Sequence, residues 1–163
     1  MNRRNFLGLS LGAAAVSMIP TALSAEDFRA SKPLVWKATK VDEAMKAMFG
    51  TTTTTAGGIN LSAPDIAENG AVIPISFDST LKARTVAIFQ DSNPEATVAV
   101  FTITPKSVID YAVRIKMQKT GTITVVADVD GTLHSVSKVV KVTIGGCGGW
   151  FNQHLWKIVK NKH

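Results

Sequence analysis

One cysteine, Cys147, lies between two pairs of glycines, Gly145-Gly146 and Gly148-Gly149. It is the only cysteine in the chain of 163 residues, so it cannot form an intramolecular disulfide. Glycine has no Cβ, which makes the backbone on both sides thin and conformationally free. The pattern predicts a thiol on a short flexible arm that can enter a narrow pocket. A lone cysteine is often a small core residue, but a glycine run packs poorly around sulfur, so we favour a functional thiol.

The sequence contains few residues that could assist this thiol in catalysis. Two of the three histidines, His154 and His163, follow the glycines, and His134 precedes them. His134 could in principle activate the thiol, although a surface histidine without that role is the simpler interpretation. The spacings typical of zinc, blue-copper, serine-hydrolase and phosphate-binding sites are missing from the sequence. We therefore expect no catalytic residue, no metal and no cofactor.

Residues 1–25 have the pattern of a targeting segment. Arg3-Arg4 precedes an apolar run from Leu7 to Ile19, as in a twin-arginine signal peptide. That run is shorter than the roughly 20 residues that span a bilayer. Small residues just before position 25 predict cleavage there. We expect a periplasmic protein, exported by the twin-arginine route, with no stable membrane anchor.

The net charge of +6 is concentrated at the two ends of the chain. All twelve acidic side chains, and all but five of the eighteen basic ones, lie between residues 26 and 149. This nearly neutral part has no basic stripe, so a nucleic acid is not expected as a partner. Its length suits one domain with an ordinary core. The five terminal basic residues are Arg3, Arg4, Lys157, Lys160 and Lys162.

Apolar residues at helical spacing predict one short helix from Thr39 to Phe49. Thr39 is the expected N-cap, and Gly50 is the expected residue just past the C-terminal end. Met45 and Met48 lie on the apolar stripe without a neighbouring histidine or cysteine. We assign these methionines to core packing and not to a copper site.

Beyond this helix the sequence predicts strands. Asp130-Gly131 predicts a tight hairpin, Pro74 predicts an edge strand or a bulge, and a slip in the alternation at Val139-Val140 predicts a bulge. We predict a mainly β fold, an immunoglobulin-like antiparallel β-sandwich of about seven strands preceded by one short helix. The last strand ends at Ile144, directly before the glycines. The predicted strands are 59–62, 72–77, 84–90, 96–104, 109–118, 121–129 and 133–144, with 65–70 as a polar connection.

Four segments follow from these patterns. They are a twin-arginine signal peptide (1–25), a β-sandwich domain (26–144), a flexible carrier arm (145–149) and an atypical C-terminal extension (150–163).

Three stretches make the chain similar to a known family. They are residues 63–74, the strand around residues 114–117 and, above all, residues 140–149 with their Gly-Gly-Cys-Gly-Gly sequence. The chain resembles SoxY, the sulfur-carrier subunit of the periplasmic thiosulfate-oxidising (Sox) system, over most of residues 26–149. The resemblance implies a covalent carrier of thiosulfate and its oxidation products, and not an enzyme. Cys147 would be the attachment point, and the arm would be Gly145, Gly146, Gly148 and Gly149.

The same resemblance implies partners. A SoxZ-like protein would form a heterodimer with the chain, the SoxYZ complex. A c-type cytochrome thiosulfate oxidase, a sulfate-releasing hydrolase and a sulfur dehydrogenase would act on the carried group. The alternative is a non-covalent periplasmic β-sandwich interaction domain whose cysteine serves only for cross-linking.

The fourteen residues 150–163 depart from the family pattern, in which the arm normally ends the chain. Phe151, Leu155, Ile158 and Val159 would share one face of a helix, with the lysines largely elsewhere. Three interpretations stay open. The extension is trimmed after export, or it is retained and docks on a partner or a membrane surface, or it is an appendage without a role.

Overall fold

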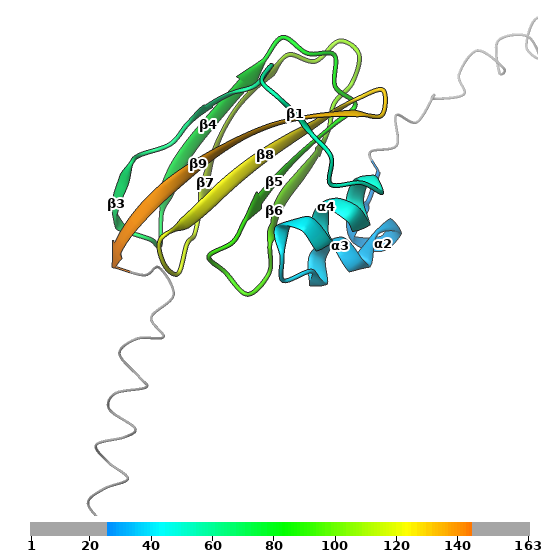
Figure 1. Cartoon of the computed structure of the whole chain (residues 1–163). Helices are drawn as coiled ribbons and strands as arrows, with labels where there is room; N and C mark the ends of the chain where they lie inside the picture. Colours follow the sequence, from blue (N-terminus) through cyan, green and yellow to red (C-terminus); the bar gives the residue numbers. More distant parts are fainter. Residues whose placement is uncertain (1–25, 145–163) are drawn as a thin grey trace, which may run out of the picture.

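The computed structural model describes residues 26–144, and within this range three short helices precede nine strands (Figure 1). No helix of this part is long and apolar enough to cross a membrane. The elements are α2 (Phe28–Ser31), α3 (Pro33–Lys37), α4 (Val41–Phe49), β1 (Thr55–Ala56), β2 (Asn60–Ser62), β3 (Ile66–Asn69), β4 (Ile73–Ser79), β5 (Thr85–Gln90), β6 (Thr97–Thr102), β7 (Ile109–Ile115), β8 (Gly121–Val129) and β9 (Thr132–Ile144).

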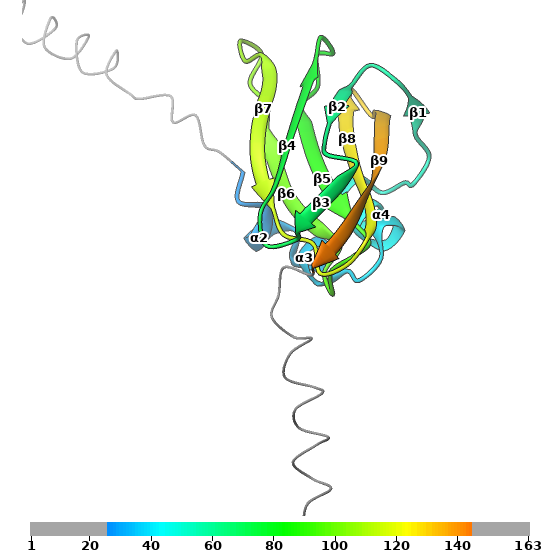
Figure 2. The same ribbon diagram turned by 90° about the vertical axis from the view of Figure 1, so that its left-hand side faces the viewer.

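The strands form two sheets that face each other (Figures 1 and 2). The large sheet has the order β1-β9-β8-β5-β6, and β3 also pairs with β9. The small sheet has the order β2-β4-β7. This arrangement confirms the predicted mainly β, immunoglobulin-like sandwich. The three helices precede all the strands in the chain.

The main core fills the space between the two sheets. Phe77 of β4 is 1% exposed, and its ring lies 5.5 Å from the ring of Tyr111 and 6.0 Å from that of Phe101, between centroids. Aromatic pairs at such distances stabilise a core beyond the area they bury. The largest fully buried residues of this core are Ile73, Phe77, Val86, Ile88, Met117, Ile123, Val125 and Val140.

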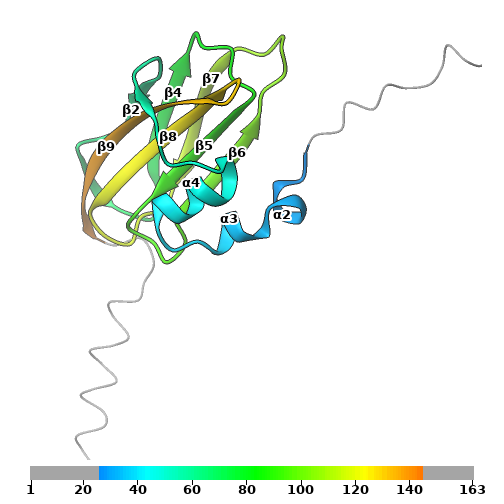
Figure 3. The same cartoon turned by 45° about the vertical axis from the view of Figure 1, so that its right-hand side comes forward.

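A second core lies on the opposite face of the large sheet, beneath α4 (Figure 3). There Ala44 and Met45 pack against Phe89 and Leu133 of the sheet. The backbone N–H of Ala96 donates to the carbonyl of Ala38 at 2.9 Å and ties the helices to the start of β6. At this end the large sheet is therefore apolar on both faces.

The predicted helix is confirmed, but its start is not. The helix begins at Val41, and Lys40 takes the N-cap position without a side-chain cap, so the assignment of Thr39 as N-cap was wrong. Gly50 ends the helix in the left-handed conformation at φ +80°, as predicted. Met45 and Met48 are 5% and 3% exposed, which confirms their place in the core.

The expectation of a single helix was wrong. α2 and α3 precede α4, and the Asp27 carboxylate caps α2 by accepting from the N–H groups of Arg29 and Ala30. α3 begins with Pro33, whose fixed φ suits the first helical position. Both helices have only four or five residues, too few for an apolar period to be visible in the sequence.

The strand count was also low, since the described residues contain nine strands. β3 lies in the segment predicted as a polar connection, and both β1 and β3 pair with β9 in parallel. In β3 only Ala67 is buried, while Ile66, Glu68 and Asn69 are exposed. An exposed edge strand needs few apolar residues, so its sequence resembles a loop.

The bulge predicted at Val139-Val140 is not present. The pairing of β8 with β9 runs in unbroken register from Gly121↔Val140 to Val129↔Thr132. Val139 is 56% exposed on the outer face of the sheet, and Val140 is buried inside. An apolar residue on the solvent side had imitated a slip in the alternation.

The structure agrees with two other predictions, one for a turn and one for a strand edge. Asp130 and Gly131 have φ +50° and +88°, which confirms the tight hairpin between β8 and β9. Pro74 lies on the central strand of the small sheet, but β2 stops opposite Ser76. At Pro74 the strand therefore has a neighbour on one side only, as an edge position would.

Candidate functional site

The end of β9 is the base from which the chain leaves the described fold. Ile144 is its last residue, and Cys147 follows three positions later. An extended chain covers about 10 Å over this interval. The predicted arm (145–149), signal peptide (1–25) and C-terminal extension (150–163) lie outside the described residues. What the structure defines is the platform that carries the arm.

β9 is held on both sides. β8 pairs with it in antiparallel fashion from Thr132 to Val140, and β1 and β3 pair with its other edge in parallel. The register Asn69↔Ile144 extends this second pairing to the last described residue (Figure 2). Among the described strands, β3 alone pairs with β9 beyond Val140, as far as Ile144.

Hydrogen bonds hold the last residues of β9 in place. The N–H of Lys141 donates to the Asp65 carbonyl at 2.9 Å, and the N–H of Val142 donates to Thr120 Oγ1 at 3.0 Å. Thr143 Oγ1 donates to the Glu68 carbonyl at 2.9 Å. These bonds anchor the base of the predicted arm to two different neighbours.

The loops around this end are also tied together. After β3 the N–H of Ala71 donates to Asn69 Oδ1 at 2.8 Å, which closes a tight turn. The N–H of Met117 donates to the Gly70 carbonyl at 2.8 Å and joins this turn to the connection between β7 and β8. The chain therefore emerges from a braced corner of the sandwich.

His134, the histidine considered as an activator of the thiol, lies at the other end of β9. It pairs with Thr55 and precedes Ile144 by ten residues, roughly 33 Å along a strand. An arm of about 10 Å does not bring Cys147 within hydrogen-bond distance of it. Among residues 26–144 no group of three or more His, Cys, Asp or Glu side chains is placed to hold a metal ion.

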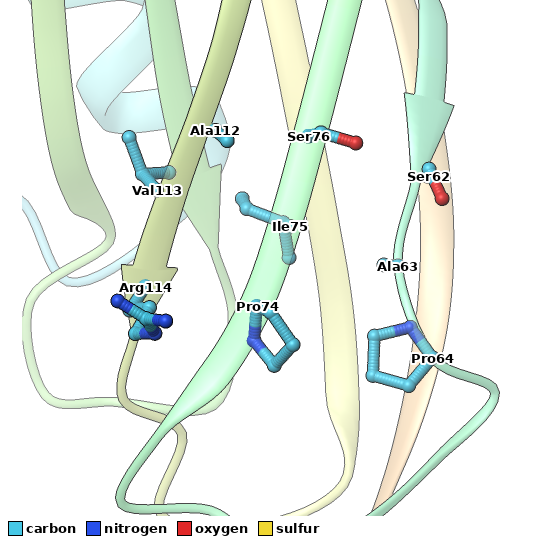
Figure 4. A pocket seen from close by; sticks show the side chains of 9 residues that line it. All are labelled: Ser62, Ala63, Pro64, Pro74, Ile75, Ser76, Ala112, Val113 and Arg114. Carbon is cyan, nitrogen blue, oxygen red and sulfur yellow. The ribbon is translucent and has the colours of Figure 1, made fainter.

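A second feature of this molecule escaped the sequence analysis. A hollow of about 690 Å³ lies over the outer face of the small sheet, open to solvent (Figure 4). Its floor is made of small side chains because Ser62, Ser76 and Ala112 stand side by side on β2, β4 and β7. The sequence shows each of these small residues, but only the strand pairing brings them side by side. Pro64, Pro74 and Arg114 line the end nearest the base of the arm.

The structure is thus a β-sandwich whose last described strand ends three residues before the single cysteine of the sequence. Comparison with known proteins assigns this arrangement to a family. The family model "Sulfur oxidation protein SoxY" matches residues 45–147, a span that ends on Cys147. The chain belongs to the SoxY family.

A solved structure supports the assignment. The sulfur carrier protein SoxY from Chlorobium limicola f thiosulfatophilum has 34% sequence identity and a TM-score of 0.59, over 65% of this chain and 98% of that chain. A superoxide reductase (neelaredoxin) from Ignicoccus hospitalis has 14% identity and a TM-score of 0.48, over 53% of this chain and 80% of that one. A likeness of that size carries no argument about function. No curated protein matches the sequence.

The family predicted from the sequence is thus confirmed. With it come a place in the Sox system of sulfur oxidation and the role of a carrier in place of an enzyme.

Proposed function

We propose that this chain carries sulfur intermediates covalently on the thiol of Cys147 during periplasmic sulfur oxidation. The observation that carries the proposal is the family match, which extends through the braced strand β9 to Cys147 itself. Gly145, Gly146, Gly148 and Gly149 serve as the arm, because residues without Cβ let a backbone enter a narrow passage.

The chemistry of loading requires an electron acceptor. The Cys147 thiolate and thiosulfate join through a new S–S bond and give a cysteine S-thiosulfonate, with the release of two electrons. A c-type cytochrome thiosulfate oxidase takes up these electrons. A hydrolase then releases sulfate with water, and a sulfur dehydrogenase oxidises the sulfur that remains on the cysteine.

The platform explains why the carrier itself needs so little chemistry. A thiolate that attacks or leaves a sulfur–sulfur bond requires access above all. The hydrogen bonds of Lys141, Val142 and Thr143 fix where the arm begins, so each partner meets the thiol within about 10 Å of the same point. A SoxZ-like protein is the proposed heterodimer partner.

Export completes the proposal. Residues 1–25 act as a twin-arginine signal peptide, and the mature protein works in the periplasm as a β-sandwich domain over residues 26–144. This fits a family that is typically periplasmic.

The test is reconstitution of thiosulfate oxidation with the mature chain, a SoxZ-like partner and the oxidising enzymes. Cys147→Ser should abolish thiosulfate-dependent electron release, because serine forms no S–S bond. Ser137→Cys in the Cys147→Ser background is the matched control, since it restores one exposed thiol on β9 away from the arm. It should remain inactive. Activity of Cys147→Ser equal to that of the unchanged chain would refute covalent carriage and favour a non-covalent interaction domain.

A further inference from the structure

The residues along the outer face of the small sheet change in character from one end of the hollow to the other. The near end of the hollow, with Pro64, Pro74 and Arg114, lies at the corner where β9 ends. From there the outward positions of β4 and β7 continue through Ser76 and Ala112 to the next pair, Asp78 and Asp110. Along this line the surface changes from apolar and cationic to small and then to acidic.

The acidic end is an electrostatic anomaly. Asp78 and Asp110 are directly opposite each other in the register of β4 with β7, and both are exposed. Like charges at such a position repel each other and destabilise a sheet. Asn60 Nδ2 donates to Asp78 Oδ2 at 2.8 Å, but among residues 26–144 neither carboxylate has an ion-pair partner. A cationic occupant would relieve the repulsion.

The chain carries such a segment within reach. Six residues separate Ile144 from Trp150 at the start of the extension, about 20 Å when extended. β3 ends beside Ile144, and five residues further on the chain reaches Pro74 after reversing direction. The near end of the hollow is therefore no further away than the arm can extend.

The order of residues in the extension matches the order along the hollow. Trp150 and Phe151 come first, and Lys157 and Lys160 follow. Pro74 and Asp78 are four residues apart on a strand, roughly 13 Å, a distance that the seven residues from position 150 to position 157 can span. Aromatic rings would meet Arg114 and the prolines, where cation–π contact is favourable, and lysines would meet the carboxylates.

We propose that residues 150–163 dock on the outer face of the small sheet, over the hollow, with their lysines at Asp78 and Asp110. This docking does not depend on the proposed carrier function.

Hydrogen–deuterium exchange of the chain that extends to His163, without thiosulfate or partners, tests the docking. We expect backbone amides of the extension to exchange at least ~10-fold more slowly than unstructured ones. Asp78→Lys with Asp110→Lys should remove this protection. Asp110→Lys alone, which leaves the Asn60–Asp78 hydrogen bond in place, should weaken it.

The matched control is Asp42→Lys with Glu95→Lys, which makes the same change in charge at two exposed carboxylates outside the hollow. It should retain the protection. Exchange of the extension at the unstructured rate in the unchanged chain would overturn the proposal. Equal protection of the extension in the Asp78/Asp110 variant and in the Asp42/Glu95 control would also overturn it. Protection lost on dilution would assign the hollow to a second copy and overturn docking within one chain. Because no thiosulfate is present, each of these results leaves the carrier function untouched.

Discussion

The two sheets of this sandwich use their outer faces differently. The outer face of the large sheet carries Ala87, Phe89, Val126 and Leu133, all buried, with α4 packed on them. The outer face of the small sheet carries Ser76, Ala112 and two aspartates with no element of the described fold over them. The outer face of the large sheet thus contributes to stability, whereas within residues 26–144 the outer face of the small sheet stays uncovered.

Truncation of a buried side chain on the covered face of the large sheet should have the largest effect on stability. Phe89→Ala removes a fully buried ring between the large sheet and α4. We expect the free energy of unfolding to fall by about 3–5 kcal/mol, the usual cost of a large core deletion. Urea denaturation followed by circular dichroism measures the change. A loss below about 1 kcal/mol would mean that α4 contributes little to the fold, which would end the distinction between the two outer faces.

A smaller effect is expected at the hairpin that leads into β9. Gly131 has φ +88°, and a Cβ there would meet no atom within 4 Å. Gly131→Ala should therefore cost only the backbone strain of the left-handed region, about 1–2 kcal/mol. Gly121→Ala is the informative comparison, because its Cβ would overlap the Asp91 carboxylate that accepts from the N–H of Thr122. Equal stability of Gly131→Ala and the unchanged chain, by the same denaturation, would contradict the strain argument.

The open face should tolerate substitution best. Ala112 points outward into the hollow, and Ala112→Leu displaces no buried side chain. In a chain shortened to end at Gly149, which lacks the extension proposed to dock over the hollow, the free energy of unfolding should stay within about 0.5 kcal/mol of that of the same chain with Ala112. A loss of more than about 2 kcal/mol in thermal or urea unfolding would contradict the assignment of Ala112 to an open face.

How much of this could be predicted from the sequence depends on how each residue is used. β7, which has one buried face, can be recognised by its alternation, whereas β8 is buried on both faces in its middle and is indicated by the Asp130-Gly131 turn that follows it. β3 could not be predicted, because a parallel edge strand with one buried residue has no period. The bulge at Val139 was wrong because an exposed valine imitates a register slip.

The site divides in the same way. That the last strand ends at Ile144 was predicted correctly, since apolar alternation stops where the glycines begin. The hydrogen bonds of Thr143 and Val142 could not be predicted, because their partners lie more than twenty positions away in the chain. The hollow was missed because small outward residues have no signature until the sheets are paired.

The central claim is that Cys147 carries the sulfur cargo. The most direct measurement is the mass of the proteolytic peptide that contains Cys147, after the mature chain has reacted with thiosulfate and a c-type cytochrome oxidase. We predict a mass increase equal to one thiosulfate with the loss of the thiol hydrogen, and its reversal by a thiol reductant. An unmodified peptide from a chain whose thiol was free beforehand, under conditions in which the cytochrome is reduced, would contradict the account.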